Sequence, residues 1–206
     1  RQQLHASLAL LPVDATQVDY LYGKLLEATP QEVPVIRDAL APHKDALLVK
    51  LWTVVEKPEQ GKEKQRLRAA AALAKYDPES EKWTNSSRLV VYDLVLENPI
   101  HLGQWSETFR PVKKSLLAPL ANIFRDRNPE RTAERSLATN ILADYAADQP
   151  ERLADLLMDA DEKQFAIIYL KFKERGEQGL PLLTAERTTT PWVVRLAERV
   201  ARLPAS

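Results

Sequence analysis

The chain of 206 residues contains no cysteine, and this absence excludes several kinds of chemistry. A disulfide bond, a thiolate zinc site and a cysteine nucleophile all require the sulfur atom of that residue. A chain that uses none of them fits the reducing environment of the cytoplasm, and we expect a cytoplasmic protein.

An excess of charge of either sign is also missing. The chain has 29 basic and 29 acidic residues, and its formal net charge is zero. No overall field therefore draws it toward nucleic acid or an anionic membrane, whereas a dedicated nucleic-acid-binding domain is usually basic. No apolar run approaches the roughly 18 residues that a membrane-spanning helix needs. We expect neither a membrane nor nucleic acid as a partner.

Glycine is scarce and proline is frequent, with 5 glycines and 14 prolines. Apolar residues recur at spacings of three and four almost everywhere, which predicts about thirteen short helices and no strand. Eight prolines lie where one helical pattern stops and the next begins, which suits the first turn of a helix: Pro30, Pro42, Pro78, Pro99, Pro111, Pro129, Pro150 and Pro191. Short polar residues precede several starts and are expected to cap them: Asp14, Asp77, Asn98, Asn128 and Asp148.

The sequence repeats itself at a period of about 65 residues, which is typical of stacked helical arrays. Residues 73–77 resemble residues 142–145, residues 40–48 resemble 109–117, and the end of the chain resembles its start. We predict a single HEAT-like α-solenoid of antiparallel helical hairpins over residues 1–206. Its repeats span approximately 1–63, 64–132 and 133–190, followed by a terminal helix at 191–206. Four leucines at matching positions are expected in its core: Leu47, Leu73, Leu116 and Leu142.

Three stretches of the sequence carry a family resemblance. Residues 134–148 read ERSLATNILADYAAD, residues 153–166 read LADLLMDADEKQFA, and residues 35–43 read VIRDALAPH. They resemble the helical region of large bacterial proteins that carry a Hanks-type serine/threonine kinase domain and a formylglycine-generating-enzyme-like (sulfatase-modifying-factor-like) domain. The resemblance covers most of the chain. Because the chain also starts inside a helical pattern without an initiator methionine, we expect a fragment of a larger protein.

The resemblance implies a non-catalytic spacer and protein-interaction scaffold within a kinase-linked signalling protein. No active residue can be carried over, because the glycine-rich loop, the His-Arg-Asp loop and the Asp-Phe-Gly motif of kinases are absent. We expect no enzymatic activity and no cofactor in this segment, and any kinase activity would belong to the rest of the protein. The expected partners are another protein or neighbouring domains of the same chain, including phosphorylated segments.

Isolated polar residues have structural explanations. The three histidines are far apart in sequence and show no metal-ligand spacing: His5, His43 and His101. Four carboxylates lie close together but lack the glycine turn of a calcium loop, so we assign them to helix capping and first-turn charges: Asp155, Asp159, Asp161 and Glu162. Thr139 and Asn140 interrupt an apolar helix. An asparagine facing the groove of such an array can pair with the backbone of a bound peptide, but the role we expect is a local hydrogen bond that ties adjacent repeats.

Zero net charge conceals a local asymmetry. Basic residues dominate positions 110–135, and acidic residues dominate positions 144–162. In one reading, consecutive repeats pair these charges across their loops. In the other, the basic stretch binds an acidic or phosphorylated segment, because arginine forks suit phosphate. The candidate residues for such an anionic partner are Arg110, Lys113, Lys114, Arg125, Arg127 and Arg131.

Two further hypotheses concern aromatic and apolar surfaces. A HEAT-like DNA-binding or glycosylase-type DNA-repair module would need aromatics in a basic groove, and Trp52, Trp83, Trp105 and Trp192 are available in principle. The apolar patterns around Trp52 and Trp105 favour core packing instead. The terminal helix at 191–206 has no following hairpin to cover it, so we expect weak self-association through it.

Overall fold

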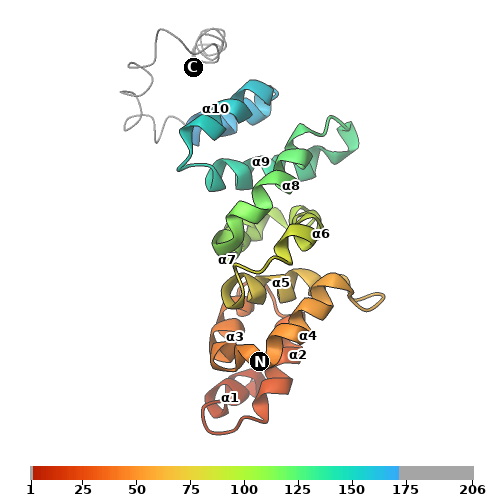
Figure 1. The fold of residues 1–206 in the computed structure, drawn as a ribbon, viewed down its shortest axis with the longest axis vertical. Helices are drawn as coiled ribbons and strands as arrows, with labels where there is room; N and C mark the ends of the chain where they lie inside the picture. Colours follow the sequence, from red (N-terminus) through yellow and green to blue (C-terminus); the bar gives the residue numbers. More distant parts are fainter. Residues whose placement is uncertain (1, 172–206) are drawn as a thin grey trace. The chain divides into compact units, whose positions relative to one another are not determined.

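The structure, a computed structural model, describes residues 2–171, and its regular elements are helices (Figure 1). No strand occurs in this range, so the prediction of an all-α fold is confirmed. The α-helices are α1 (Gln2–Leu10), α2 (Gln17–Glu27), α3 (Glu32–Leu40), α4 (Lys44–Glu56), α5 (Gln65–Tyr76), α6 (Trp83–Val95), α7 (Leu102–Phe109), α8 (Lys113–Arg125), α9 (Thr132–Tyr145) and α10 (Pro150–Asp159). Residues 162–171 are also helical.

The chain divides into two compact units. The N-terminal unit ends at Pro119 and the C-terminal unit begins at Leu120, so the division falls inside α8. Pro119 is an interior residue of that helix and has no amide hydrogen to donate to the preceding turn. None of the helices between residues 2 and 171 combines the length and the apolar character needed to cross a bilayer.

Helix α5 lies at the centre of the N-terminal unit. It contacts α2, α3, α4, α6 and α7, so it is surrounded on nearly all sides. The run from Ala69 to Ala74 is completely buried, together with Leu67. Alanine side chains are small enough for several helix backbones to approach this one closely, and interiors packed in this way leave few voids. The alanine-rich sequence therefore specifies a central helix.

Proline-containing 3-10 turns link consecutive helices. η1 (Ala41–His43) joins α3 to α4, and η3 (Arg110–Val112) joins α7 to α8. η2 (Pro99–His101) precedes α7, and η4 (Pro129–Arg131) precedes α9. The predicted placement of proline at helix starts thus holds at Pro42, Pro99, Pro111, Pro129 and Pro150, four of them in 3-10 segments that periodicity did not reveal.

Most of the expected turn residues cap as predicted. The side chains of Asn98 and Asn128 accept the amides of Ile100 and Glu130, both at 3.0 Å. Asp14 likewise accepts the Thr16 amide at 3.0 Å. The prediction for Asp77 is wrong, because this residue ends α5, and the residue before α6 is Lys82.

The four leucines expected in the core are buried: Leu47, Leu73, Leu116 and Leu142. The predicted repeat starts at 64 and 133 lie next to the first residues of α5 and α9, Gln65 and Thr132. Pro191, Trp192 and the terminal helix expected at 191–206, with its self-association, lie outside the described residues, as does the part of the third predicted repeat that follows residue 171.

Candidate functional site

The basic stretch meets the acidic stretch inside the C-terminal unit. Arg125, the last residue of α8, bonds through Nε to Asp159 Oδ2 at 2.7 Å. Arg127 donates to the main-chain oxygen of Asp159 at 2.6 Å, and its Nη1 lies 3.9 Å from Asp161 Oδ2. These two arginines therefore face the end of α10 and the start of the helix at 162–171.

Arg131 and Arg135 extend this network along the start of α9. Arg131 binds Asp126 at 2.7 Å and also pairs with Glu134. Arg135 lies 3.4 Å from Asp161 and donates to the main-chain oxygen of Asp126 at 2.9 Å. The amide of Asn128, with Arg131 adding to the effect, lowers the pKa of Asp126, so this carboxylate stays ionised. The loop between α8 and α9 is thus a network of alternating charges.

A buried glutamine fixes the acidic side of this network. Gln164 donates to the Phe124 carbonyl oxygen at 2.8 Å and to Thr139 Oγ1 at 3.3 Å. Asp161 and Gln164 also exchange reciprocal amide-to-side-chain hydrogen bonds, which form a capping box at the start of the helix 162–171. The capping role expected for Asp161 is confirmed. Thr139 and Asn140 donate within their own helix, to the carbonyl oxygens of Arg135 and Ser136 at 2.7 and 2.9 Å, so these two bonds do not tie adjacent repeats as expected.

The six candidate residues for an anionic partner are divided between the two units. Arg125, Arg127 and Arg131 lie in the C-terminal unit, and each contacts a carboxylate. Arg110, Lys113 and Lys114 belong to the N-terminal unit, where Arg110 binds Glu107 of its own helix turn. The geometry matches the first reading of the asymmetry, in which neighbouring elements pair their charges. Binding of a phosphorylated segment stays a prediction, and such a ligand would have to compete with Asp159 and Asp161.

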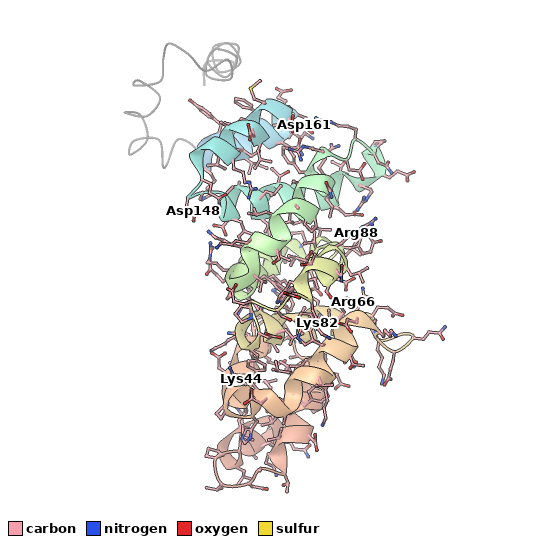
Figure 2. All side chains as sticks on the ribbon, in the orientation of Figure 1. Lys44, Arg66, Lys82, Arg88, Asp148 and Asp161 are labelled. Carbon is pink, nitrogen blue, oxygen red and sulfur yellow. The ribbon has the colours of Figure 1, made fainter. Side chains whose placement is uncertain are left out.

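Two ion pairs connect α5 to α6 and to the residues just after it, and the sequence analysis did not identify them. Arg66, labelled in Figure 2, lies 3.1 Å from Asp93, and Arg68 lies 2.7 Å from Glu97. Burial raises the pKa of Asp93 in spite of the adjacent guanidinium. Arg68 also covers the ring of Trp105, whose centroid is 5.4 Å from the guanidinium carbon. No local spacing predicts these pairs, because Arg66 and Arg68 are two residues apart and do not share one face of a helix.

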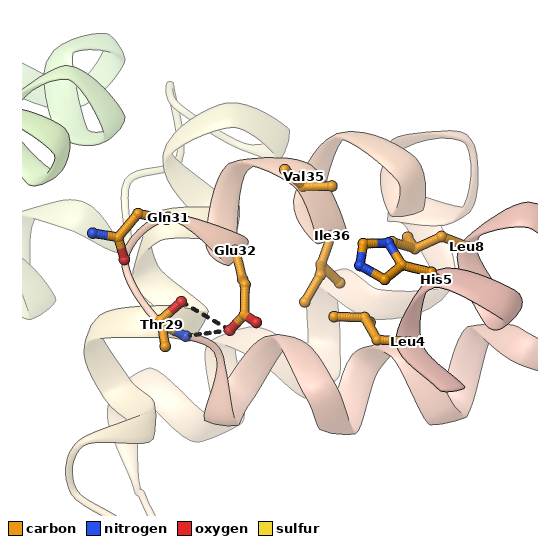
Figure 3. A pocket seen from close by; sticks show the side chains of 8 residues that line it. All are labelled: Leu4, His5, Leu8, Thr29, Gln31, Glu32, Val35 and Ile36. Carbon is orange, nitrogen blue, oxygen red and sulfur yellow. Dashed lines mark hydrogen bonds between the residues drawn. The ribbon is translucent and has the colours of Figure 1, made fainter. Parts of the chain in front are cut away.

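A hollow lies between α1 and α3 of the N-terminal unit (Figure 3). Leu4, Leu8, Val35 and Ile36 line it, with the ring of His5 among them. At the other end Glu32 is engaged, because its carboxylate accepts the amide and the hydroxyl of Thr29 at 3.0 and 2.8 Å. This carboxylate caps α3, so we assign no catalytic role to it.

The three histidines are far apart in the sequence and do not belong to a common cluster of metal-ligand side chains within residues 2–171. His101 is hydrogen-bonded to Gln31 at 3.0 Å, which connects the start of α7 to the turn before α3. Within residues 2–171 no group of three or more histidine, aspartate or glutamate side chains is arranged to hold a metal ion.

Three of the four tryptophans are buried and cannot line an open groove: Trp52, Trp83 and Trp105. Trp192 lies outside the described residues. The core packing favoured for Trp52 and Trp105 is confirmed, and these buried rings do not support the DNA-repair alternative, which was based on tryptophans in an open basic groove.

An exposed apolar face on α6 is the surface feature that sequence reasoning missed. Leu89, Tyr92 and Leu96 are 42%, 49% and 55% exposed, and Ile100 just beyond the helix is 83% exposed. The opposite face of α6 is buried through Val90, Val91, Leu94 and Val95. Because apolar residues occur on both faces between Leu89 and Leu96, the sequence alone does not show which of the two faces is buried. Only the structure separates its outer face from its inner face.

Comparison with known proteins adds no assignment: no family model matches the chain, and neither a curated protein nor a solved structure is significantly similar to it.

Proposed function

We propose that this chain is a HEAT-like α-solenoid that acts as a non-catalytic spacer and protein-interaction scaffold in a serine/threonine-kinase-linked protein. The observation that supports this most directly is the recurrence of one connection. Helix α3 leads through η1 into α4, and α7 leads through η3 into α8. Each 3-10 link has proline as its second residue, Pro42 in one and Pro111 in the other.

The order of helices supports the same proposal. Four α-helices precede the predicted boundary at 63, and four more lie between that boundary and residue 132. Helix α5, the first of the second set, packs against α2, α3 and α4 of the first set. A solenoid builds a continuous core through contact between successive repeats, since a single repeat cannot bury its own apolar face.

The role as a spacer follows from this architecture together with the family resemblance. Stacked repeats present long surfaces and hold what is attached to their ends at a fixed separation. In the family that the sequence resembles, the attached domains are a kinase and a formylglycine-generating-enzyme-like domain. The chain would thus hold such domains in place and offer them a binding surface.

A binding titration tests the proposal. The purified chain is titrated with the kinase domain and the formylglycine-generating-enzyme-like domain encoded in the same reading frame. We expect saturable association with at least one of them and no phosphotransfer from ATP by the chain alone. A reading frame that encodes neither domain, or turnover by the chain after contaminants are removed, would refute the kinase-linked scaffold.

A further inference from the structure

The outer face of α6 and the segment after it carry four of the large apolar residues that stay exposed between residues 2 and 171. Leu89, Tyr92 and Leu96 lie three and four residues apart and so share one side of the helix. Ile100 follows after the helix end and extends the apolar surface. From Leu89 to Leu96 the stripe covers about two helical turns, or about 10 Å of helix axis. A stripe of this length matches the contact face of a short partner helix.

The first repeat supplies an internal comparison. Pro30 corresponds to Pro99 and Pro42 to Pro111, at the same separation along the chain. At that separation, Leu96 and Ile100 correspond to Glu27 and Gln31, which are exposed. Tyr92 corresponds to Gly23, and Leu89 to Tyr20. Two of these four positions are thus polar in the first repeat and a third is glycine, so the fold itself does not require apolar residues there.

The charges around this face indicate the kind of partner. Arg88, labelled in Figure 2, is exposed on α6 next to Leu89, and no residue between 2 and 171 forms an ion pair or hydrogen bond with it. The carboxylates of the same segment, Asp93 and Glu97, are both engaged by arginines of α5. Among residues 83–100, the exposed charge beside the apolar stripe is therefore a single cation.

We propose that the outer face of α6 binds an amphipathic helix of another protein segment, with its apolar stripe on Leu89, Tyr92, Leu96 and Ile100 and a carboxylate on Arg88. This inference rests on the proposed scaffold function and assigns a binding surface to it. A helix in such a groove or on such a face is anchored by side chains at positions i, i+3, i+4 and i+7, and an exposed cation at one end fixes its direction. A second copy of this chain fits less well, because its α6 offers no unengaged carboxylate for Arg88.

Two synthetic peptides test the proposal with the intact chain. Each is about 18 residues long and helical, with leucines at positions i, i+4, i+7 and i+11 on one face. They are identical except that one carries two glutamates and the other two lysines beside the leucine stripe. Binding is measured by fluorescence anisotropy of the labelled peptides at low salt.

Three variants of the chain are compared with the wild type, and the first of them uses residues that the chain already has at equivalent positions. A triple variant, Arg88→Asp with Leu96→Glu and Ile100→Gln, places the polar residues of the first repeat on the second. A charge-reversal variant, Arg88→Glu, changes only the cation. Val49→Glu alters an exposed apolar residue of α4 and serves as the matched control. Circular dichroism and urea unfolding check that each variant folds.

We expect the glutamate peptide to bind the wild type saturably and at least about tenfold more tightly than the lysine peptide. The triple variant should lose at least about tenfold in affinity, Val49→Glu should change nothing, and Arg88→Glu should reverse the preference between peptides. If the triple variant does not fold, that reversal alone decides the outcome. Absence of saturable binding, or equal binding to wild type and triple variant, would overturn the assignment of this face.

Two results separate this inference from the broader proposal. If the wild type and the triple variant bind the peptides equally but the chain binds a neighbouring domain saturably, the scaffold proposal holds and only the binding surface assigned to α6 is refuted. Concentration-dependent dimerisation that the triple variant abolishes would assign the face to a second copy and overturn the partner proposed here.

Discussion

Two indole rings converge on Asp77 at the C-terminal end of α5. Trp52 donates its indole hydrogen to Asp77 Oδ2 at 2.9 Å, and Trp83 donates to the Asp77 carbonyl oxygen at 3.0 Å. The rings meet edge to face with centroids 5.3 Å apart. Lys82, labelled in Figure 2, lies over Trp52 and also binds Glu56. One residue thus satisfies polar groups from α4 and α6 at the end of the helix between them.

Removing the Asp77 carboxylate should destabilise the protein measurably. Asp77→Ala leaves the buried indole hydrogen of Trp52 without an acceptor, which costs about 1–3 kcal/mol. Asp77→Asn keeps an acceptor oxygen and should cost less. Urea unfolding followed by tryptophan fluorescence measures both. Equal losses for the two variants would mean that the bond from Trp52 contributes nothing.

Tyr76 gives the protein a sensitivity to high pH. Its hydroxyl donates to the Arg37 carbonyl oxygen in α3, and burial raises the pKa of Tyr76. A raised tyrosine pKa means that the folded state holds the proton more tightly than the unfolded state does. The stabilisation is therefore complete below the unfolded value of about 10 and is lost as the pH rises above it.

Comparison of the wild type with Tyr76→Phe isolates this effect. Below pH 9 the variant should be less stable by about 0.5–1.5 kcal/mol, because it lacks the hydrogen bond. Above about pH 10 the wild type alone must keep Tyr76 protonated in order to fold. The difference in the free energy of unfolding between the two proteins should therefore shrink. Tyr22, whose pKa is also raised by burial, is present in both proteins and affects them alike. A difference that stays constant from pH 8 to pH 11 would exclude the proposed linkage.

Residue roles were predictable where the cause is local. Asn98 and Asn128 cap because each precedes a proline in a short turn, and that pattern is visible in the sequence. Asp77 has the same appearance in Asp77-Pro78, but its carboxylate is used by Trp52 from an earlier helix. A tertiary hydrogen bond of this kind has no signature in the neighbouring residues, so the sequence alone could not assign it.

At the scale of elements, α5 shows why the fold class was predictable. Its alanine run and its apolar spacing indicate a helix that other helices approach closely, and the structure places it among five of them.

The exposed face of α6 was not predictable, because apolar residues on two sides of a helix look the same in sequence whether one side or both are buried. The pairing partners of the basic stretch were anticipated only as acidic residues of the next segment. Their identities depend on how α10 ends beside α8, which only the structure gives.

The contact between α8 and α10 gives a prediction for the candidate site. Arg125 and Asp159 are 50% and 44% exposed, so their pair is screened by solvent. Arg125→Glu should destabilise the C-terminal unit by at most about 1 kcal/mol, and adding Asp159→Arg should restore most of the loss. The coupling measured by this double-mutant cycle should fall in about 1 M salt, where charges are screened within about 3 Å.

Urea unfolding of the four proteins of this cycle at low and high salt measures the coupling. Arg125→Gln serves as a control, because it removes the charge without introducing repulsion against Asp159. A double variant as unstable as Arg125→Glu alone would show that the pair is not formed in solution. In that case Arg125 is open to an anionic ligand, which favours the second reading of the charge asymmetry.

At the scale of the whole molecule, the chain has two compact units and a helix that belongs to both. The sequence repeat was visible because equivalent positions keep the same residues, as at Leu73 and Leu142. The division at Pro119 was not visible, because neither composition nor charge changes there. It depends on which contacts the folded chain makes, and a period in the sequence describes similarity between segments rather than the contacts between them.

Leu73 and Leu142 allow a matched test of how the two units share stability. Both are buried leucines, one in α5 of the N-terminal unit and the other in α9 of the C-terminal unit. Truncation to alanine should cost about 2–5 kcal/mol at either site. Because the units are separately compact, we expect Leu73→Ala to lower amide protection in α5 much more than in α9, and Leu142→Ala to do the reverse. Native-state hydrogen exchange of both helices measures this, with exposed Leu10→Ala and Leu170→Ala as controls. Equal loss of protection in both helices from either variant would mean that the chain unfolds as one cooperative body.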